Sequence, residues 1–147
     1  MPQMLAFVRE LAEYEKQPQE VVATEEDLLR DGFGESPRYF CLVADWDGTP
    51  AGFAFYFHTY STWVGRWGIY LEDLYVTPHL RGRGIGRALL VELARIAVRE
   101  KSGRMNWQVL DWNAPAIGFY RSLGAQLLDD WRICRLTGDA LKEATRA

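Results

Sequence analysis

Residues 68–100 read GIYLEDLYVTPHLRGRGIGRALLVELARIAVRE, a stretch that predicts a strand, a glycine-rich turn and a long amphipathic helix. Residues 69–76 are rich in β-branched, aromatic and large aliphatic side chains, and Thr77 and Pro78 end this run. After the turn, apolar side chains recur at helical spacing at Ile85, Leu89, Leu93, Ile96 and Ala97. The stretch therefore indicates a buried strand that leads directly into a helix.

The turn, RGRGIG at residues 81–86, predicts an anion site. Its glycines let the backbone approach a ligand, and a helix that starts there points unpaired N–H groups and its positive dipole end at the same place. No Lys-Ser/Thr pair follows the glycines, and Gly82, Gly84 and Gly86 are not spaced as in the dinucleotide fingerprint, so both nucleotide loops are excluded. A pyrophosphate is the natural ligand, and a glycine-rich turn without a ligand is the alternative.

Length and composition indicate one globular domain over residues 1–147, with 48% hydrophobic and 25% charged residues. The net charge of −3 argues against a general nucleic-acid binder. No apolar run is long enough to span a bilayer and no signal segment opens the chain, so we expect a cytoplasmic protein without a membrane partner. Cys41 and Cys134 are expected to be small buried packing residues, and His58 and His79 stand too far apart to suggest a metal site.

The rest of the chain alternates helical and strand-like patterns. Helices are expected from almost the first residue to Tyr14, after a cap at Thr24 with a stop at Gly32, and over residues 114–123. Strands are expected at residues 38–45, 51–58 and 105–110 and as a pair within 126–136, with a hairpin turn at Asp47 and Gly48 and a loop at 59–67. This order indicates an α/β domain with a mixed sheet.

Two further stretches identify a family. Residues 111–116 read DWNAPA and residues 119–125 read FYRSLGA. Together with Arg81, Gly84 and Gly86, which fit the pattern Arg/Gln-x-x-Gly-x-Gly/Ala, they resemble the signature of the GNAT superfamily of N-acetyltransferases. The runs EEDLLRDGFG at 25–34, YLED at 70–73 and DWN at 111–113 are similar to the spermidine/spermine N-acetyltransferase subfamily, and this resemblance covers nearly the whole chain.

The resemblance implies the GNAT fold: a mixed, mostly antiparallel sheet with a splayed central strand and flanking helices. Chains of this family open with an extra strand before the first helix, whereas this sequence starts inside that helix, so the first family strand is expected to be missing. A second departure is YSTW at 60–63: polyamine acetylases carry an aspartate where Ser61 stands, whereas thialysine acetyltransferases have Ser-Thr-Trp. One fewer carboxylate favours an amine shorter than the long polyamines.

The implied function is transfer of acetyl from acetyl-CoA, without a metal, to the primary amine of a small cation by direct attack. The substrate classes are a diamine, a polyamine or a thialysine-like amino acid, and the family suggests a homodimer. The alternatives are the same chemistry on a protein N-terminus or an aminoglycoside, and a non-catalytic module that binds acyl-CoA. The residues implied to bind acetyl-CoA are Leu74, Tyr75, Val76, Arg81, Gly82, Arg83, Gly84, Ile85, Gly86, Arg87, Asn113 and Ala116.

Glu72 is the candidate base. An alkylamine resembles lysine, with a pKa near ~10.4, so at neutral pH only on the order of one molecule in a few thousand is uncharged and a base is useful. A carboxylate in mid-strand beside Leu71 and Leu74 needs a reason, although an exposed or salt-bridged strand residue is the alternative. Asp73 lies on the opposite side of a regular strand and joins the site only if a bulge breaks the alternation.

Tyr120 is the candidate general acid toward the departing sulfur, and a core tyrosine beside Phe119 is the alternative. A tyrosine with pKa ~10 is a weaker acid than a thiol at ~8.5, so full proton transfer costs about 2 kcal/mol and Tyr120 chiefly serves as a hydrogen-bond donor to the thiolate. Asn113 is either a pantetheine ligand or an ordinary helix N-cap.

The resemblance implies an amine site of eight residues. Trp63 and Trp131 are expected to wall it with aromatic faces, which suit a cation, and core or dimer packing is the alternative for each. The residues implied to bind substrate are Tyr14, Glu15, Trp63, Glu72, Asp73, Asn106, Trp107 and Gln108, with residues 106–108 running beside pantetheine.

Overall fold

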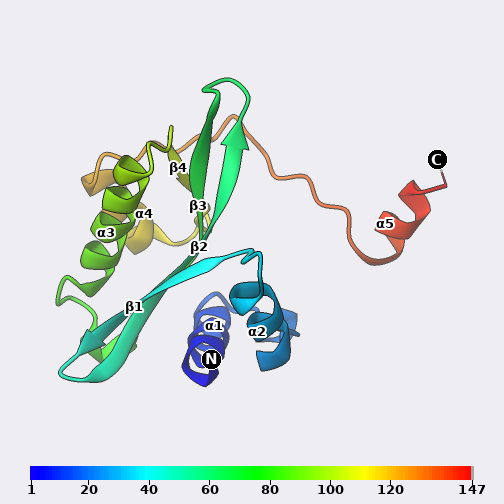
Figure 1. Ribbon diagram of the computed structural model, residues 1–147. Helices are drawn as coiled ribbons and strands as arrows, with labels where there is room; N and C mark the ends of the chain where they lie inside the picture. Colours follow the sequence, from blue (N-terminus) through cyan, green and yellow to red (C-terminus); the bar gives the residue numbers. More distant parts are fainter. Residues whose placement is uncertain (147) are drawn as a thin grey trace. The chain divides into compact units, whose positions relative to one another are not determined.

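The computed structural model describes residues 1–146 (Figure 1). It divides into two compact units, the first Met1–Leu110 and the second from Asp111 onward. The prediction of a single domain stays a prediction. The first unit contains α1 (Pro2–Tyr14), η1 (Pro18–Glu20), α2 (Glu25–Phe33), β1 (Phe40–Trp46), β2 (Thr49–Ser61), β3 (Arg66–Val76), η2 (Pro78–Leu80), α3 (Ile85–Arg99) and β4 (Met105–Trp107). The second contains α4 (Ala114–Ser122) and α5 (Gly138–Ala144).

The four strands form one sheet in the order β1-β2-β3-β4. The pairs β1–β2 and β2–β3 are antiparallel, and β3–β4 is parallel. Parallel neighbours need a crossover connection, and α3 provides it between β3 and β4. The predicted α/β class with a mixed, mostly antiparallel sheet is confirmed.

Two hairpins connect the antiparallel strands. Asp47 and Gly48 both have positive φ, 50° and 79°, as a two-residue type I′ turn requires, so the predicted β1–β2 hairpin is confirmed. The predicted loop at residues 59–67 is wrong, because β2 continues to Ser61 and β3 starts at Arg66. The rings of Tyr60 and Trp67 meet edge to face across these strand ends, with centroids 5.6 Å apart, and this cross-strand pair stabilises the longer hairpin.

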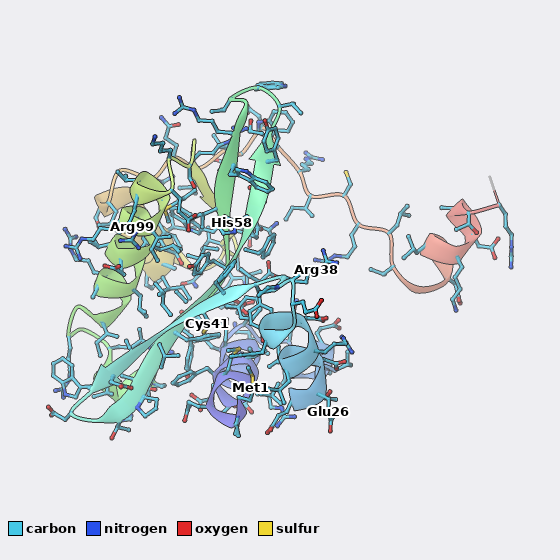
Figure 2. The ribbon with its side chains drawn as sticks, viewed as in Figure 1. Met1, Glu26, Arg38, Cys41, His58 and Arg99 are labelled. Atoms are coloured by element: carbon cyan, nitrogen blue, oxygen red, sulfur yellow. The ribbon has the colours of Figure 1, made fainter. Side chains whose placement is uncertain are left out.

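One face of the sheet carries the core beneath α1. Phe7 of α1 stacks on Phe53 of β2 with ring centroids 5.4 Å apart, and Tyr75 of β3 lies 6.0 Å from the same ring. Phe7 and Phe53 are almost completely buried, and burial of each such side chain contributes about 1.5–3 kcal/mol. Cys41 and Met1 also pack against this cluster, and both are labelled in Figure 2.

The helix α3 contacts β1, β2 and β3 through its buried residues Ile85, Leu89, Leu90, Leu93, Ile96 and Ala97. His58 of β2, which follows the α1-facing Phe57, points to this second face, where its Nε2 lies 2.7 Å from Oε2 of Glu100 at the end of α3 (Figure 2). Helix packing on both faces therefore holds β2 and β3 in place.

Several predicted elements differ from the structure. No strand forms within residues 126–136 of the described chain, so the predicted strand pair is wrong: this segment finds no partner strand, and a lone strand cannot satisfy its backbone. Cys134 lies there and is exposed, contrary to prediction, whereas Cys41 is half-buried. The helix α5 was not predicted; α2 continues past Gly32 to Phe33, and β4 ends at Trp107.

Candidate active site

A β-bulge in β3 sets the geometry of the candidate site. Phe55 of β2 pairs with Asp73, and the next residue, Tyr56, pairs with Leu71, so Glu72 has no partner on β2. Phe57 then pairs with Tyr70. The extra residue puts Tyr70 and Asp73 on the same face of the sheet as Phe55 and Phe57, the face that α1 covers. The bulge that Asp73 needs in order to join the site is thus present.

Beyond the bulge, one edge of β3 is open. β4 pairs with β3 only at Ile69, Tyr70 and Leu71, and no strand within residues 1–146 continues along residues 72–76 on that side. The strands therefore separate at this point, as expected of a splayed central strand.

Backbone directions show which groups this edge presents. The N–H of Thr77 donates to the carbonyl of Ala51 at 2.8 Å, on the β2 side. Because successive strand residues alternate, Leu74 and Val76 turn their N–H groups toward the open edge, and Tyr75 turns its N–H toward β2. The carbonyl of Val76 accepts a hydrogen bond from Nε of Arg81 at 2.9 Å, which agrees with this direction. Of Leu74, Tyr75 and Val76, which are all expected to bind acetyl-CoA, two thus point their N–H groups to the open edge.

Three carboxylates gather where the bulge meets the C-terminal end of α1. Burial first, then the charge of Glu72 and then that of Glu15, raises the pKa of Asp73 to about 7. Burial and then Glu72 also raise the pKa of Glu15, the C-cap of α1. Such mutual shifts require the three groups to lie close together. The structure therefore brings together Glu15, Glu72 and Asp73, as predicted, although their roles stay predictions.

The opposite end of the open edge is positive. The Arg81 guanidinium lies over the rings of Tyr14 and Tyr75, at 4.9 Å and 5.4 Å from their centroids. Arg83 lies over the ring of Trp46 at 5.3 Å. These cation–π contacts place two guanidinium groups beside the glycine turn.

The turn itself fits an anion. Gly82 and Gly84 have φ of 77° and 80°, a left-handed conformation that glycine adopts without strain. Gly84 is the N-cap of α3, and neither a side-chain cap nor an acidic residue occupies the first turn. A Cβ on Gly86 would meet only Val76 Cγ2, at 3.6 Å. The N–H groups of this turn, with Ile85 and Arg87 after Gly84, suit the pyrophosphate of acetyl-CoA.

The other expected substrate residues of the first unit lie in two places. Asn106 and Trp107 of β4 pair with Tyr70 and Leu71 next to the bulge, and Gln108 follows them. Trp63 stands in the turn of the β2–β3 hairpin and is 86% exposed, so the core alternative is wrong for it. Its role toward substrate stays a prediction.

The second unit carries Asn113 and Tyr120. Oδ1 of Asn113 accepts from the N–H of Ala116 at 3.3 Å, so this buried residue is the N-cap of α4. Tyr120 is half-buried on α4 beside Phe119, with ring centroids 5.4 Å apart. Trp131 is 71% exposed, so it does not pack in a core. The pantetheine and acid roles of Asn113 and Tyr120 stay predictions.

Some contacts of the site lay beyond sequence reasoning. Glu10 forms a hydrogen bond with Tyr75 that, after burial, raises the pKa of this tyrosine to about 12. The helical stripe pointed to Tyr14 but gave no signal for Glu10, which lies off it. Ser61 accepts hydrogen bonds from Arg104 and from the N–H of Val64. A pattern comparison at Ser61 cannot show these partners.

Among residues 1–146 no cluster of three or more histidine, cysteine, aspartate or glutamate side chains is arranged to hold a metal ion. The described helices include none that is long and apolar enough to cross a membrane.

Comparison with known proteins agrees with this geometry. Residues 5–125 match the acetyltransferase (GNAT) family. The chain is 43% identical over 151 aligned positions to a thialysine N-epsilon-acetyltransferase of Bos taurus, covering 95% of this chain and 88% of that protein. It is 37% identical to the spermidine/spermine N(1)-acetyltransferase-like protein 1 of Homo sapiens, covering 95% of this chain and 21% of that protein.

A solved structure shares the fold. An integron cassette protein from the mobile metagenome of V. cholerae superposes with a TM-score of 0.80 at 28% identity, covering 98% of this chain and 90% of that one. The opened strand and the glycine turn that follows it are thus those of an α/β acetyltransferase. The chain belongs to the GNAT family, whose members use acetyl-CoA as co-substrate, and it is an N-acetyltransferase.

Proposed function

We propose that this enzyme transfers acetyl from acetyl-CoA to the primary amine of a small cationic substrate: a diamine, a short polyamine or a thialysine-like amino acid. The observation that carries the proposal is the carboxylate cluster Glu15, Glu72 and Asp73 at one end of the open β3 edge. Arg81, Arg83 and the N-terminus of α3 lie at the other end. A cation is attracted to the first end and the anionic phosphates of CoA to the second.

The residues of the first unit divide the work along this edge. The glycine turn and Arg81 receive the pyrophosphate, and the N–H groups of Leu74 and Val76 receive pantetheine and the acetyl carbonyl, where they stabilise the oxyanion. The carboxylate cluster binds the ammonium group and removes a proton from it. Bound acetyl-CoA supplies the activated acetyl group. Tyr120 supplies a hydrogen bond to the departing thiolate.

The relatives support two amine classes. The name of the bovine relative gives thialysine, an amino acid, and that of the human relative gives spermidine and spermine, which are polyamines. Both classes carry a primary amine and further positive charge, which three carboxylates can bind.

The proposal extends to the state of the protein. We place it in the cytoplasm as a homodimer, acting without nucleic acid or membrane. The exposed apolar side chains Trp131, Ile133 and Leu136 support contact with a second copy, and the net charge of −3 speaks against nucleic acid. Light scattering behind size-exclusion chromatography tests the dimer, and a monomer at micromolar concentration would contradict it.

The function is tested by release of free CoA thiol from acetyl-CoA with putrescine, spermidine, lysine and thialysine offered separately. Amine-dependent release is expected, and Glu72→Gln should raise the KM for the amine about tenfold, as loss of one charged hydrogen-bond partner predicts. Glu35→Gln is the matched control, because Glu35 is exposed in the loop after α2. CoA binding without release for any amine would instead favour a non-catalytic module.

A further inference from the structure

The bulge gives two neighbouring carboxylates different surroundings. Glu72, the unpaired bulge residue, is exposed, whereas Asp73 is half-buried on the face beneath α1. Asp73 lies in a row across the sheet with Phe55 of β2 and Cys41 of β1, since these residues are register partners. The exposed carboxylate is solvated, and that of Asp73 is half-buried in the row that includes Phe55 and Cys41.

The titratable groups around Asp73 come from three elements. Glu72 acts from its own strand and Glu15 from the end of α1, and both are negative. From β1, the thiol of Cys41 has its pKa raised to about 11 by burial and then by the charge of Asp73, while the amino terminus opposes this shift. Cys41 is thus an uncharged neighbour at neutral pH, and a deprotonated Asp73 gains stabilisation when a cation enters.

Resting on the proposed function, we propose that Asp73, rather than Glu72, accepts the proton that the ammonium group of the substrate loses. Glu72 then serves to hold the ammonium group and to pass the proton on to water. This assignment is chemically matched, because a base is most effective when its pKa lies near the working pH, and that of Asp73 is raised to about 7. An ordinary carboxylate is a far weaker base.

The carboxylate of Asp73 takes one proton from the ammonium group, leaving a neutral amine whose lone pair attacks the thioester carbonyl. The C–N bond forms, the C–S bond breaks, and the thiolate takes up the second proton that the nitrogen loses as it becomes an amide. Asp73 then releases its proton to solvent, so each turnover yields the acetylated amine, CoA thiol and one proton.

The test is the pH dependence of kcat/KM for the amine in wild type, Asp73→Asn, Glu72→Gln and Glu15→Gln, with Asp45→Asn as an exposed control. In wild type, kcat/KM should fall as the pH decreases through neutrality, which is the acidic limb of the profile. Asp73→Asn should abolish this limb and lower kcat/KM about 10²–10⁴-fold. Glu72→Gln and Glu15→Gln should keep the limb and move it to lower pH, because each removes a negative charge that raises the pKa of Asp73.

The opposite pattern overturns the assignment: a limb that vanishes in Glu72→Gln and persists in Asp73→Asn makes Glu72 the base. Asp73→Glu, which keeps a carboxylate, should restore a limb, so a mere folding defect of the asparagine variant is recognised. Carbon-13 NMR titration of the aspartate carboxyls gives a readout without turnover, and an Asp73 signal that titrates at an ordinary aspartate pKa also contradicts the inference. Absence of amine-dependent release at every pH contradicts the proposed function itself.

Discussion

The side chain of Arg81 is fastened to the end of β3, with its Nε donating to the carbonyl oxygen of Val76 at 2.9 Å. The same guanidinium lies over the ring of Tyr14 at the end of α1. One side chain thus connects the open edge, the glycine turn and the helix that brings Glu15.

Replacing Arg81 by glutamine should weaken CoA binding about tenfold or more, because a charge-assisted hydrogen bond contributes roughly 1.5–3 kcal/mol. Isothermal titration with CoA measures the Kd. Arg38→Gln removes the same charge from an exposed residue before β1 and should leave the Kd unchanged. Equal effects of the two substitutions would mean that Arg81 contributes to CoA binding only through its net charge.

Gly84→Ala should lower both stability and CoA affinity, because φ of 80° strains any L side chain by about 1 kcal/mol. Gly65→Ala in the β2–β3 hairpin is the matched control, because Gly65 has φ of 68° and the new Cβ would lie in open space. Both variants should unfold at lower denaturant concentration, and only Gly84→Ala should raise the Kd for CoA. An unchanged Kd in Gly84→Ala would remove the turn from the CoA site.

Tyr120→Phe should lower kcat at least tenfold while leaving the Kd for CoA nearly unchanged, because it removes one hydrogen bond to the departing thiolate and no packing. Single-turnover kinetics separate the chemical step from product release. Tyr60→Phe, at an exposed tyrosine of the β2–β3 hairpin, is the control and should keep kcat. A Tyr120→Phe enzyme with full kcat would support the alternative that Tyr120 only packs beside Phe119.

The pKa of Asp73 also predicts how stability depends on pH. Its folded value of about 7 lies above the ordinary 3.8, so the folded state binds the proton more tightly than the unfolded state does. The resulting stabilisation is complete below pH 3.8 and is lost as pH rises through about 7. Asp73→Asn should therefore gain melting temperature relative to wild type between about pH 4 and pH 8. A constant difference in Tm over this range would contradict the shift.

Ser61→Asp should leave the preference between spermidine and thialysine nearly unchanged. The hydroxyl of Ser61 already accepts a hydrogen bond from Arg104, so a carboxylate there would pair with that guanidinium instead of a substrate amine. The ratio of kcat/KM for spermidine to that for thialysine should change less than about threefold, since an exposed ion pair contributes ~0–1 kcal/mol. Ser61→Ala controls for loss of the hydroxyl. A rise of tenfold or more would place residue 61 at the substrate.

The sequence predicted those parts of the fold that local patterns control. Thr24 forms the capping box with Asp27 that its spacing indicated, and Asp47 and Gly48 form the expected turn. The strand before the glycine turn and the helix after it are also where the pattern put them. Each of these features depends on residues that are neighbours in the chain.

Features that depend on distant partners could not be predicted in the same way. Residues 126–136 have strand-like side chains, but a strand exists only where another strand accepts its hydrogen bonds. The long β2–β3 hairpin depends on the contact between Tyr60 and Trp67, which residue types alone do not reveal. The bulge could be predicted only as a condition for Asp73 to join the site, because it arises where β3 has one residue more than the part of β2 that pairs with it.

That mismatch makes the candidate site depend on chain length as well as on residue type. Insertion of a single residue between Phe55 and Tyr56 would give Glu72 a partner on β2, remove the bulge and separate Tyr70 from Asp73 onto opposite faces. Either Asp73, or Ile69 and Leu71 with their buried side chains, would then have to move to the other face of the sheet. Substitutions at Glu72 can tune such an enzyme, but an inserted residue opposite it on β2 would disrupt the core and the chemistry together, so the number of residues in β2 is constrained as well as their types.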